Sequence, residues 1–204
     1  VLSSAEQLHS SLFQGQTDRS SIFQFVFQEL QQVLPSLPDQ HSNKEGNYYG
    51  RITQPVVNFL LAKLALNAEI YMYDDWTQGY ASRPKGSDIH FSVPASDASL
   101  RNGDKVDCRK LNAWETCIYY CDKLAEEGYV LESDDSFNFS THNETSKENI
   151  FTIPMDKNIY TNQFHYLFRS YHYTHGGVLG WGSENGTCAT ISTMKANHYG
   201  EADE

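Results

Sequence analysis

The chain has few basic residues and no basic run. Its 204 residues include 15 Lys and Arg against 26 Asp and Glu, which gives a formal net charge of -11 at pH 7. Binding to a phosphate backbone requires a clustered basic surface, so the composition argues against a nucleic-acid partner. Aromatic residues are abundant instead, with 13 Tyr, 11 Phe and 3 Trp. Many of them stand among polar residues, where they can form contact surfaces.

Cysteine is also scarce. The four cysteines are Cys108, Cys117, Cys121 and Cys188, and their spacing lacks the paired C-x2-C units of zinc sites. Cys117 and Cys121 lie four apart on a predicted helix, so both side chains would project from one face. We expect the cysteines to be buried as small apolar residues, with a disulfide or a metal site as the alternatives. We expect no bound metal and no cofactor.

The sequence has no long apolar run that is free of polar residues. Its most apolar stretch, residues 54–73, reads QPVVNFLLAKLALNAEIYMY and predicts one helix of roughly 30 Å. Asn58, Lys63, Asn67 and Glu69 interrupt this stretch, and their cost in hydrocarbon argues against a membrane span. Because the helix has almost no polar face, we expect it to be buried on several sides within a stack of helices.

A first amphipathic helix is predicted before the apolar stretch. It begins after Asp18, which can cap it, and it ends at Pro35 and Pro38. The connection at residues 39–47 is short, which is typical of two helices that pack as antiparallel neighbours. The apolar residues that recur at helical spacing are Ile22, Phe23, Val26, Phe27, Leu30, Val33 and Leu34.

A third helix is predicted further along the chain. Asn112 and Glu115 match a capping box at its start, and Gly128 can end it. Trp114 would lie on the same face as Ile118, so we expect Trp114 to pack in the core between helices.

The remaining segments have no sustained period. Residues 74–110 are punctuated by Gly, Pro, Ser and Asp and are predicted to form a long loop, of a length that is often functional. Beyond Gly128 the chain is irregular, with a short strand candidate at 150–153. The sequence therefore predicts a mainly α fold in one structural unit, in which a helical-repeat part, residues 1–128, packs against an irregular, loop-rich part, residues 129–204.

The order of five sequence stretches resembles the SusD/RagB family. GRIT at residues 50–53 precedes LLAKLALNAEIY in the apolar helix, and WETCIYYCDKL follows, leading into GYVL. KENIFTIPMD comes next with NQF after it, and NGTCAT completes the order. The resemblance covers nearly the whole chain, from about Ser21 to Tyr199.

The resemblance implies a fold, a function and a location. Family members are much longer and stack tetratricopeptide-like helical hairpins in an α-α superhelix, so this chain would be a central fragment of such a protein. They are non-catalytic, lipid-anchored proteins at the outer-membrane cell surface of Bacteroidetes-type bacteria. They capture glycans or other nutrients and pass them to a SusC-like TonB-dependent transporter. By resemblance, we expect the same of this protein, with its lipid anchor in a part of the full-length protein outside this chain.

Glycan capture requires exposed aromatic rings with polar neighbours. A sugar packs its C–H face on an indole or phenol ring, and its hydroxyls bind Asn, Asp, Arg and Tyr side chains. Trp181 is the strongest candidate, because Gly180 and Gly182 would leave its ring accessible. Each aromatic candidate could instead pack against the helices and hold its loop in place. The candidates are Trp181, Tyr173, Tyr171, Trp76, Tyr80, Asp75 and Arg83.

Three other functions stay open at the level of sequence. A helical-repeat stack could serve as a protein-interaction adaptor, because such stacks offer a concave surface. A glycosidase needs only two carboxylates at a defined separation. A metal-dependent hydrolase could use a histidine cluster, although no HExxH or GxSxG motif accompanies it. The residues of that cluster would be His165, His172, His175, Asp156 and Glu184.

Overall fold

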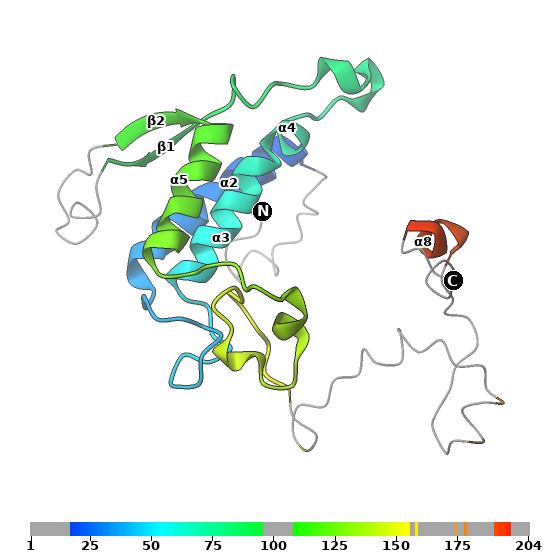
Figure 1. Ribbon diagram of the computed structural model, residues 1–204. Coiled ribbons are helices and arrows are strands. Elements are labelled where there is room, and N and C mark those ends of the chain that lie inside the picture. Colours follow the sequence, from blue (N-terminus) through cyan, green and yellow to red (C-terminus); the bar gives the residue numbers. More distant parts are fainter. Residues whose placement is uncertain are drawn as a thin grey trace, which may run out of the picture. The chain divides into compact units, whose positions relative to one another are not determined.

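The computed structural model describes residues 17–95, 108–155, 158, 174, 178 and 190–196. The described part is mainly helical, as the sequence predicts, with one two-stranded sheet (Figure 1). The chain divides into two units, Val1–Ile153 and Pro154–Glu204. In the second unit the structure describes one short helix, α8 (Ile191–Ala196). The first unit contains the other described helices and the sheet.

Helix α2 (Arg19–Val33) confirms the first predicted helix, and a 3₁₀ turn, η1 (Leu34–Ser36), extends it. Phe23 and Phe27 are its buried residues. The predicted cap is only partly right, because Asp18 occupies the N-cap position but makes no side-chain capping bond. The backbone carbonyl of Asp18 accepts the first helical hydrogen bond, from the Ile22 N–H at 3.2 Å.

The apolar stretch does not form one helix, which corrects the prediction. Helix α3 (Gln54–Leu66) ends at Asn67, and a separate short helix, α4 (Ala68–Tyr71), follows. The Asn67 side chain donates a hydrogen bond to the carbonyl oxygen of Lys63 at 2.8 Å. Side-chain amides that bond to the local backbone compete with helical hydrogen bonds, and here that competition accompanies the break.

Burial of α3 on several sides is also only partly correct. Leu61 and Ala65 are fully buried, whereas Phe59, Leu60 and Leu66 are exposed. In the described part of the chain, α2 and α5 are the long helices that pack on α3. They cover one side of it and leave an apolar side open.

The first two helices form the predicted antiparallel hairpin, as hydrogen bonds at both ends show. The end of α2 meets the start of α3, where Gln54 donates from its backbone to Pro38 and from its side chain to Leu37. The start of α2 meets the end of α4, where the backbone N–H of Ser20 donates to Asp74 Oδ1 at 3.0 Å.

Helix α5 (Ala113–Glu126) confirms the third predicted helix and its capping box. The Asn112 side chain accepts from the Glu115 N–H at 3.0 Å, and the Glu115 carboxylate accepts from the Asn112 N–H at 2.8 Å. Gly128 follows the helix with φ +90°, a conformation that glycine adopts at little cost. Helices α3 and α5 lie side by side (Figure 1).

The prediction that Trp114 packs between helices is wrong. Trp114 is 42% exposed and Ile118 is 59% exposed. The face of α5 that is buried carries Thr116, Tyr120 and other residues, about 100° or more around the helix from Trp114. The indole covers the loop before the sheet instead, since a Cβ placed on Gly86 would lie 2.4 Å from Trp114 Cε2.

The cysteines also differ from expectation. Cys108 and Cys121 are exposed, Cys117 is half-buried, and Cys188 lies outside the described residues. Burial and the neighbouring Cys121 raise the pKa of the Cys117 thiol to about 11, so this thiol stays protonated and unreactive at neutral pH.

The predicted loop at 74–110 contains a strand, which sequence spacing did not reveal. Strand β1 (His90–Pro94) pairs antiparallel with β2 (Cys108–Asn112), in the register His90 opposite Asn112. The strand candidate at 150–153 is not a strand. A two-stranded pair gains its stability from packing on a helix layer, which a local pattern does not encode. Val93 of β1 is fully buried.

The core is built around aromatic rings that join α2 to the sheet and to α5. Phe27 stacks on Phe91 with ring centroids 4.2 Å apart, and Phe23 stacks on Tyr71 at 5.4 Å. Tyr120 meets Phe27 edge to face at 6.4 Å. Each such pair adds about 1 kcal/mol beyond its buried area. These contacts join α2 to α4, β1 and α5.

Candidate functional site

Four of the seven predicted glycan contacts lie together in the loop that follows α4. This loop contains two 3₁₀ turns, η2 (Trp76–Gln78) and η3 (Tyr80–Ser82). The four residues on it are Asp75, Trp76, Tyr80 and Arg83. The other three predicted contacts, Trp181, Tyr173 and Tyr171, lie outside the described residues.

The loop is shaped by local polar bonds. The Asp75 carboxylate accepts from both the backbone N–H and the hydroxyl of Thr77. These bonds, with one from Gln78, lower the pKa of Asp75, so the carboxylate is ionised at neutral pH and serves to hold the turn. Gly79 has φ +80°, and its carbonyl accepts from the Tyr73 hydroxyl at 2.8 Å.

Trp76 is an exposed ring held in a defined position. Its indole is 43% exposed and meets Tyr73 edge to face, with centroids 4.9 Å apart. The Arg19 guanidinium lies over the indole, 5.1 Å from the ring centroid. Arg19 also donates to the Tyr73 carbonyl oxygen. The indole is therefore fixed from two sides before any ligand arrives.

Tyr80 is a second exposed ring on the same loop. It is 61% exposed, and the Arg83 guanidinium covers one ring face at 3.7 Å from the centroid. Arg83 is held in turn by Glu69, with Nε 2.8 Å from Glu69 Oε2. The Gly86 N–H and Arg83 both donate to the Glu69 carboxylate and lower its pKa, so this pair stays ionised.

An open hollow of about 410 Å³ lies beside Trp76. Its lining residues are Thr17, Asp18, Arg19, Asp74 and Trp76. Of the predicted contacts, only Trp76 is among them, so Asp75, Tyr80 and Arg83 stand outside the hollow on the adjoining loop. The hollow thus combines one indole face with two carboxylates and a guanidinium.

Sequence reasoning missed the polar lining of this hollow. Thr17, Asp18 and Arg19 lie at the start of α2, and the bonds that join this segment to Tyr73 and Asp74 come from Arg19 and Ser20, 54 positions earlier in the chain. Asp74 accepts from the Ser20 hydroxyl and backbone N–H, which lowers the pKa of Asp74 and ties the two segments. The predicted antiparallel hairpin was the one signal that could have brought these segments together.

The hollow has the groups needed to hold a polar ligand. Its carboxylates and guanidinium can exchange hydrogen bonds with hydroxyl groups, and its indole offers an apolar face. Within the residues that the structure describes, no group of three or more His, Cys, Asp or Glu side chains could hold a metal ion. The predicted histidine cluster, with His165, His172, His175, Asp156 and Glu184, lies outside those residues.

No family model matches the chain, and no curated protein or solved structure matches it either. Among the helices of the described residues, none is long and apolar enough to cross a membrane.

Proposed function

We propose that this protein is a non-catalytic, surface-exposed glycan-binding protein of the SusD/RagB type. It captures an oligosaccharide and passes it to a SusC-like TonB-dependent transporter in the outer membrane. The observation that carries the proposal is the exposed indole of Trp76, fixed by Arg19 and Tyr73 at the edge of a hollow with two carboxylates. The transporter, the outer-membrane location and the lipid anchor rest on the family resemblance.

The arrangement around Trp76 meets the needs of sugar recognition. One face of a pyranose ring can pack on the exposed part of the indole, while its hydroxyls donate to Asp18 and Asp74 and accept from Arg19. Because contacts with neighbouring residues already hold the indole and Asp74, little side-chain freedom is lost on binding. Tyr80 on the adjoining loop offers a second ring for a longer glycan.

The helical framework is consistent with the tetratricopeptide-like superhelix that the proposal includes. The α2–α3 hairpin is one antiparallel helix pair, and α5 packs along α3 as the next helix. In such stacks the outer helices need further neighbours to cover their apolar sides. The exposed Phe59 and Leu66 of α3 fit a chain that continues the stack on that side.

The decisive experiment is affinity electrophoresis of the full chain in gels that contain a panel of polysaccharides. We expect at least one polysaccharide to retard the wild-type protein. Trp76→Ala should weaken that retardation about tenfold or more, and Trp76→Phe should restore part of it. Phe139→Ala is the matched control, because Phe139 is an equally apolar, highly exposed ring outside the hollow.

Two results would overturn this function. If Trp76→Ala were retarded as strongly as the wild type, the hollow would not be the glycan-binding site. Release of reducing sugar from a retained polysaccharide would identify the protein as a glycosidase, which needs a pair of carboxylates, and the hollow contains two.

A protein-interaction adaptor is the second candidate, and one observation favours it. Phe59, Leu60 and Leu66 of α3 and Ile118 of α5 are exposed large apolar side chains on two neighbouring helices, and exposed apolar surface of this kind often marks a protein contact. Absence of retardation by every polysaccharide, together with self-association that Leu66→Ser abolishes in light scattering, would favour this function over glycan capture.

A further inference from the structure

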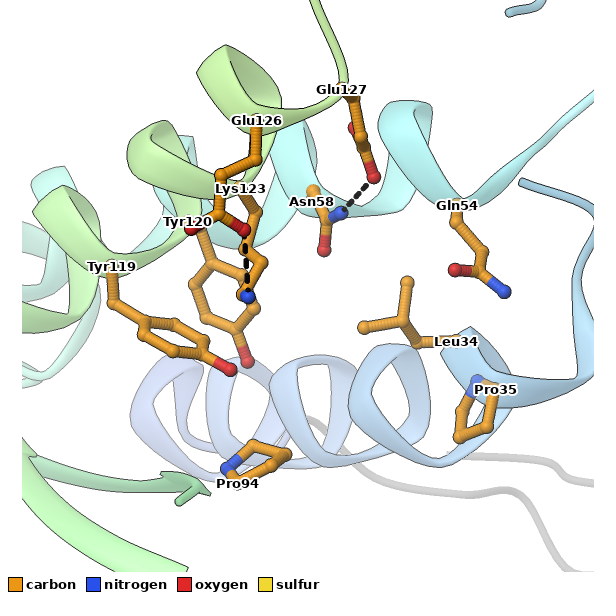
Figure 2. Close-up of a pocket in the computed structure, with 10 residues that line it drawn as sticks. All are labelled: Leu34, Pro35, Gln54, Asn58, Pro94, Tyr119, Tyr120, Lys123, Glu126 and Glu127. Atoms are coloured by element: carbon orange, nitrogen blue, oxygen red, sulfur yellow. Dashed lines mark hydrogen bonds and ion pairs between the residues drawn. The ribbon is translucent and has the colours of Figure 1, made fainter. Parts of the chain in front are cut away.

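A second cavity lies at the opposite end of the α2–α3 hairpin from Trp76. It has a volume of about 270 Å³ and is formed by the end of α2, the start of α3, the last two turns of α5 and the end of β1 (Figure 2). This size suits one small molecule rather than a chain of sugars. Its lining residues are Leu34, Pro35, Gln54, Asn58, Pro94, Tyr119, Tyr120, Lys123, Glu126 and Glu127.

The polar groups of the cavity are concentrated on the α3–α5 side. Asn58 is only 4% exposed, and its Nδ2 donates to Glu127 Oε1 at 3.0 Å (Figure 2). The other carboxylate oxygen, Glu127 Oε2, is buried and has no hydrogen-bond partner in the structure. Glu127 as a whole is half-buried, but a carboxylate oxygen that is buried without a partner is costly to a folded protein, so this oxygen calls for an explanation.

The nearby cation of the cavity is already engaged by a different carboxylate. Lys123 Nζ lies 3.0 Å from Glu126 Oε2 (Figure 2). The Glu127 carboxylate accepts a hydrogen bond from the Asn58 side-chain amide, and it lies at the C-terminal end of α5, where the helix dipole disfavours negative charge. A bound cation would pair with Glu127 Oε2 and would offset the unfavourable interaction of the carboxylate with the helix dipole.

The electrostatics of Glu127 agree with this geometry. Burial raises the pKa of Glu127 to about 7, against the opposing effects of the Asn58 hydrogen bond and the Lys123 charge. Asp39, before α3, and Glu126 also raise this pKa. Tyr129, whose own pKa is raised to about 12 by burial, stays neutral. The His41 ring also lies against Glu127, with Nε2 2.8 Å from the Glu127 carbonyl oxygen. Lys123 is the charged group that lowers the pKa of Glu127, whereas Asp39 and Glu126 raise it.

We infer that this cavity binds a small molecule that carries a protonated amine, with the ammonium group at the Glu127 carboxylate and the apolar part of the molecule against Leu34, Pro35 and Pro94. The Tyr119 ring beside the cavity already lies against two cations of the protein, with Arg109 Cζ 5.1 Å and Lys123 Nζ 5.6 Å from its centroid, so the ammonium group is assigned to Glu127 alone. An uncharged, hydroxylated molecule of the same shape would leave the carboxylate without a counter-charge. This site is separate from the Trp76 hollow and does not depend on the proposed glycan function.

The probe for this inference is cyclohexylamine, with cyclohexanol as its uncharged equivalent of the same shape. Binding of each to the full chain is measured by NMR titration of the backbone and side-chain amides, including the Asn58 side-chain amide. We expect cyclohexylamine to bind at pH 8 at least about tenfold more tightly than cyclohexanol, since a counter-charge for a buried carboxylate is worth more than about 1.4 kcal/mol.

Two variants with the same change in charge make the test specific. Glu127→Gln should weaken cyclohexylamine binding about tenfold and leave cyclohexanol unaffected. Glu29→Gln removes a carboxylate from the exposed side of α2, away from the cavity lining, and should bind the amine as the wild type does. Equal affinity for amine and alcohol, or undiminished amine binding by Glu127→Gln, would overturn the inference.

The pH dependence of the wild-type protein provides a test that needs no variant. A carboxyl group with a pKa near 7 is about one-tenth ionised at pH 6, whereas an alkylamine stays protonated up to pH 9 or above. Cyclohexylamine should therefore bind about tenfold more tightly at pH 8 than at pH 6. A flat profile, or tighter binding at pH 6, would contradict the assignment of Glu127 as the counter-ion.

Discussion

Glu127 makes a residue-scale prediction about stability and pH. Its pKa in the folded protein is raised to about 7 by burial, whereas in the unfolded chain it should lie near 4.3. The folded state therefore binds the proton more tightly, and stability falls as pH rises between about 4.5 and 7. Because the carboxyl is only partly buried and solvent screens it, we expect a loss of about 1 kcal/mol.

Urea denaturation of wild type and Glu127→Gln at pH 5 and pH 8 measures this effect. The amide cannot ionise, so the variant should lack that part of the pH dependence and should equal or exceed the wild type at pH 8. Glu29→Gln, with an exposed carboxylate, should keep the wild-type profile. A variant profile that is parallel to wild type would show that other groups set the slope.

At the scale of elements, the capping box of α5 is the clearest test of a sequence motif. Asn112→Ala removes the bond from the Glu115 N–H and should lower the free energy of unfolding by about 1 kcal/mol in urea denaturation. Glu115→Gln keeps an acceptor for the Asn112 N–H, so it should cost less than half as much. Equal losses in the two variants would mean that charge at the helix start, rather than the box geometry, stabilises α5.

The same elements show what sequence patterns reach and what they miss. Helical period and capping residues predicted α2, α3 and α5, because both are properties of neighbours within a few positions. The break at Asn67 and the β1–β2 pair were missed, since each depends on contacts formed only in the folded chain. The prediction for Trp114 was wrong because helical spacing shows which residues share a face of α5 but not which face packs on α3.

Part of the candidate site could likewise be predicted from the sequence, and part could not. Trp76 and Tyr80 could be found as aromatic residues in a loop rich in turn-forming residues, and the structure places both at the surface. Asp18 and Arg19 could not, because they reach the hollow from the start of another helix. Polar partners that come from distant segments are the part of a site that a single sequence does not reveal.

On the scale of the whole first unit, one buried hydrogen bond connects two long irregular segments. Asn43, fully buried in the connection between α2 and α3, donates to the Ser146 carbonyl oxygen at 2.7 Å. Asn43→Ala leaves that buried carbonyl without its partner, which typically costs about 1–3 kcal/mol. Hydrogen–deuterium exchange should quicken in residues 129–150 and stay slow in α3. Asn47→Ala, at an exposed position in the same connection, should leave the exchange rates of residues 129–150 and of α3 unchanged.

The two proposed sites lie at opposite ends of the α2–α3 hairpin, and this separation makes the final prediction. Arg19 at the start of α2 contributes to the Trp76 hollow, whereas Leu34 just beyond its end lines the second cavity. A helix of this length separates the sites by about 20 Å, and effects at sites so far apart are usually additive. Trp76→Ala should therefore bind cyclohexylamine with wild-type affinity, and Glu127→Gln should be retarded by polysaccharide as the wild type is.

A double variant completes this experiment. Its losses in amine and polysaccharide binding should equal those of the two single variants within about 0.5 kcal/mol, as measured by the same titration and gel. Loss of polysaccharide retardation in Glu127→Gln would instead mean that the cavity and the hollow belong to one site, or that they are coupled through α2. Amide shifts confined to the Asn58 region on amine addition would separate those two cases, because coupling through α2 would also shift the Arg19 amide.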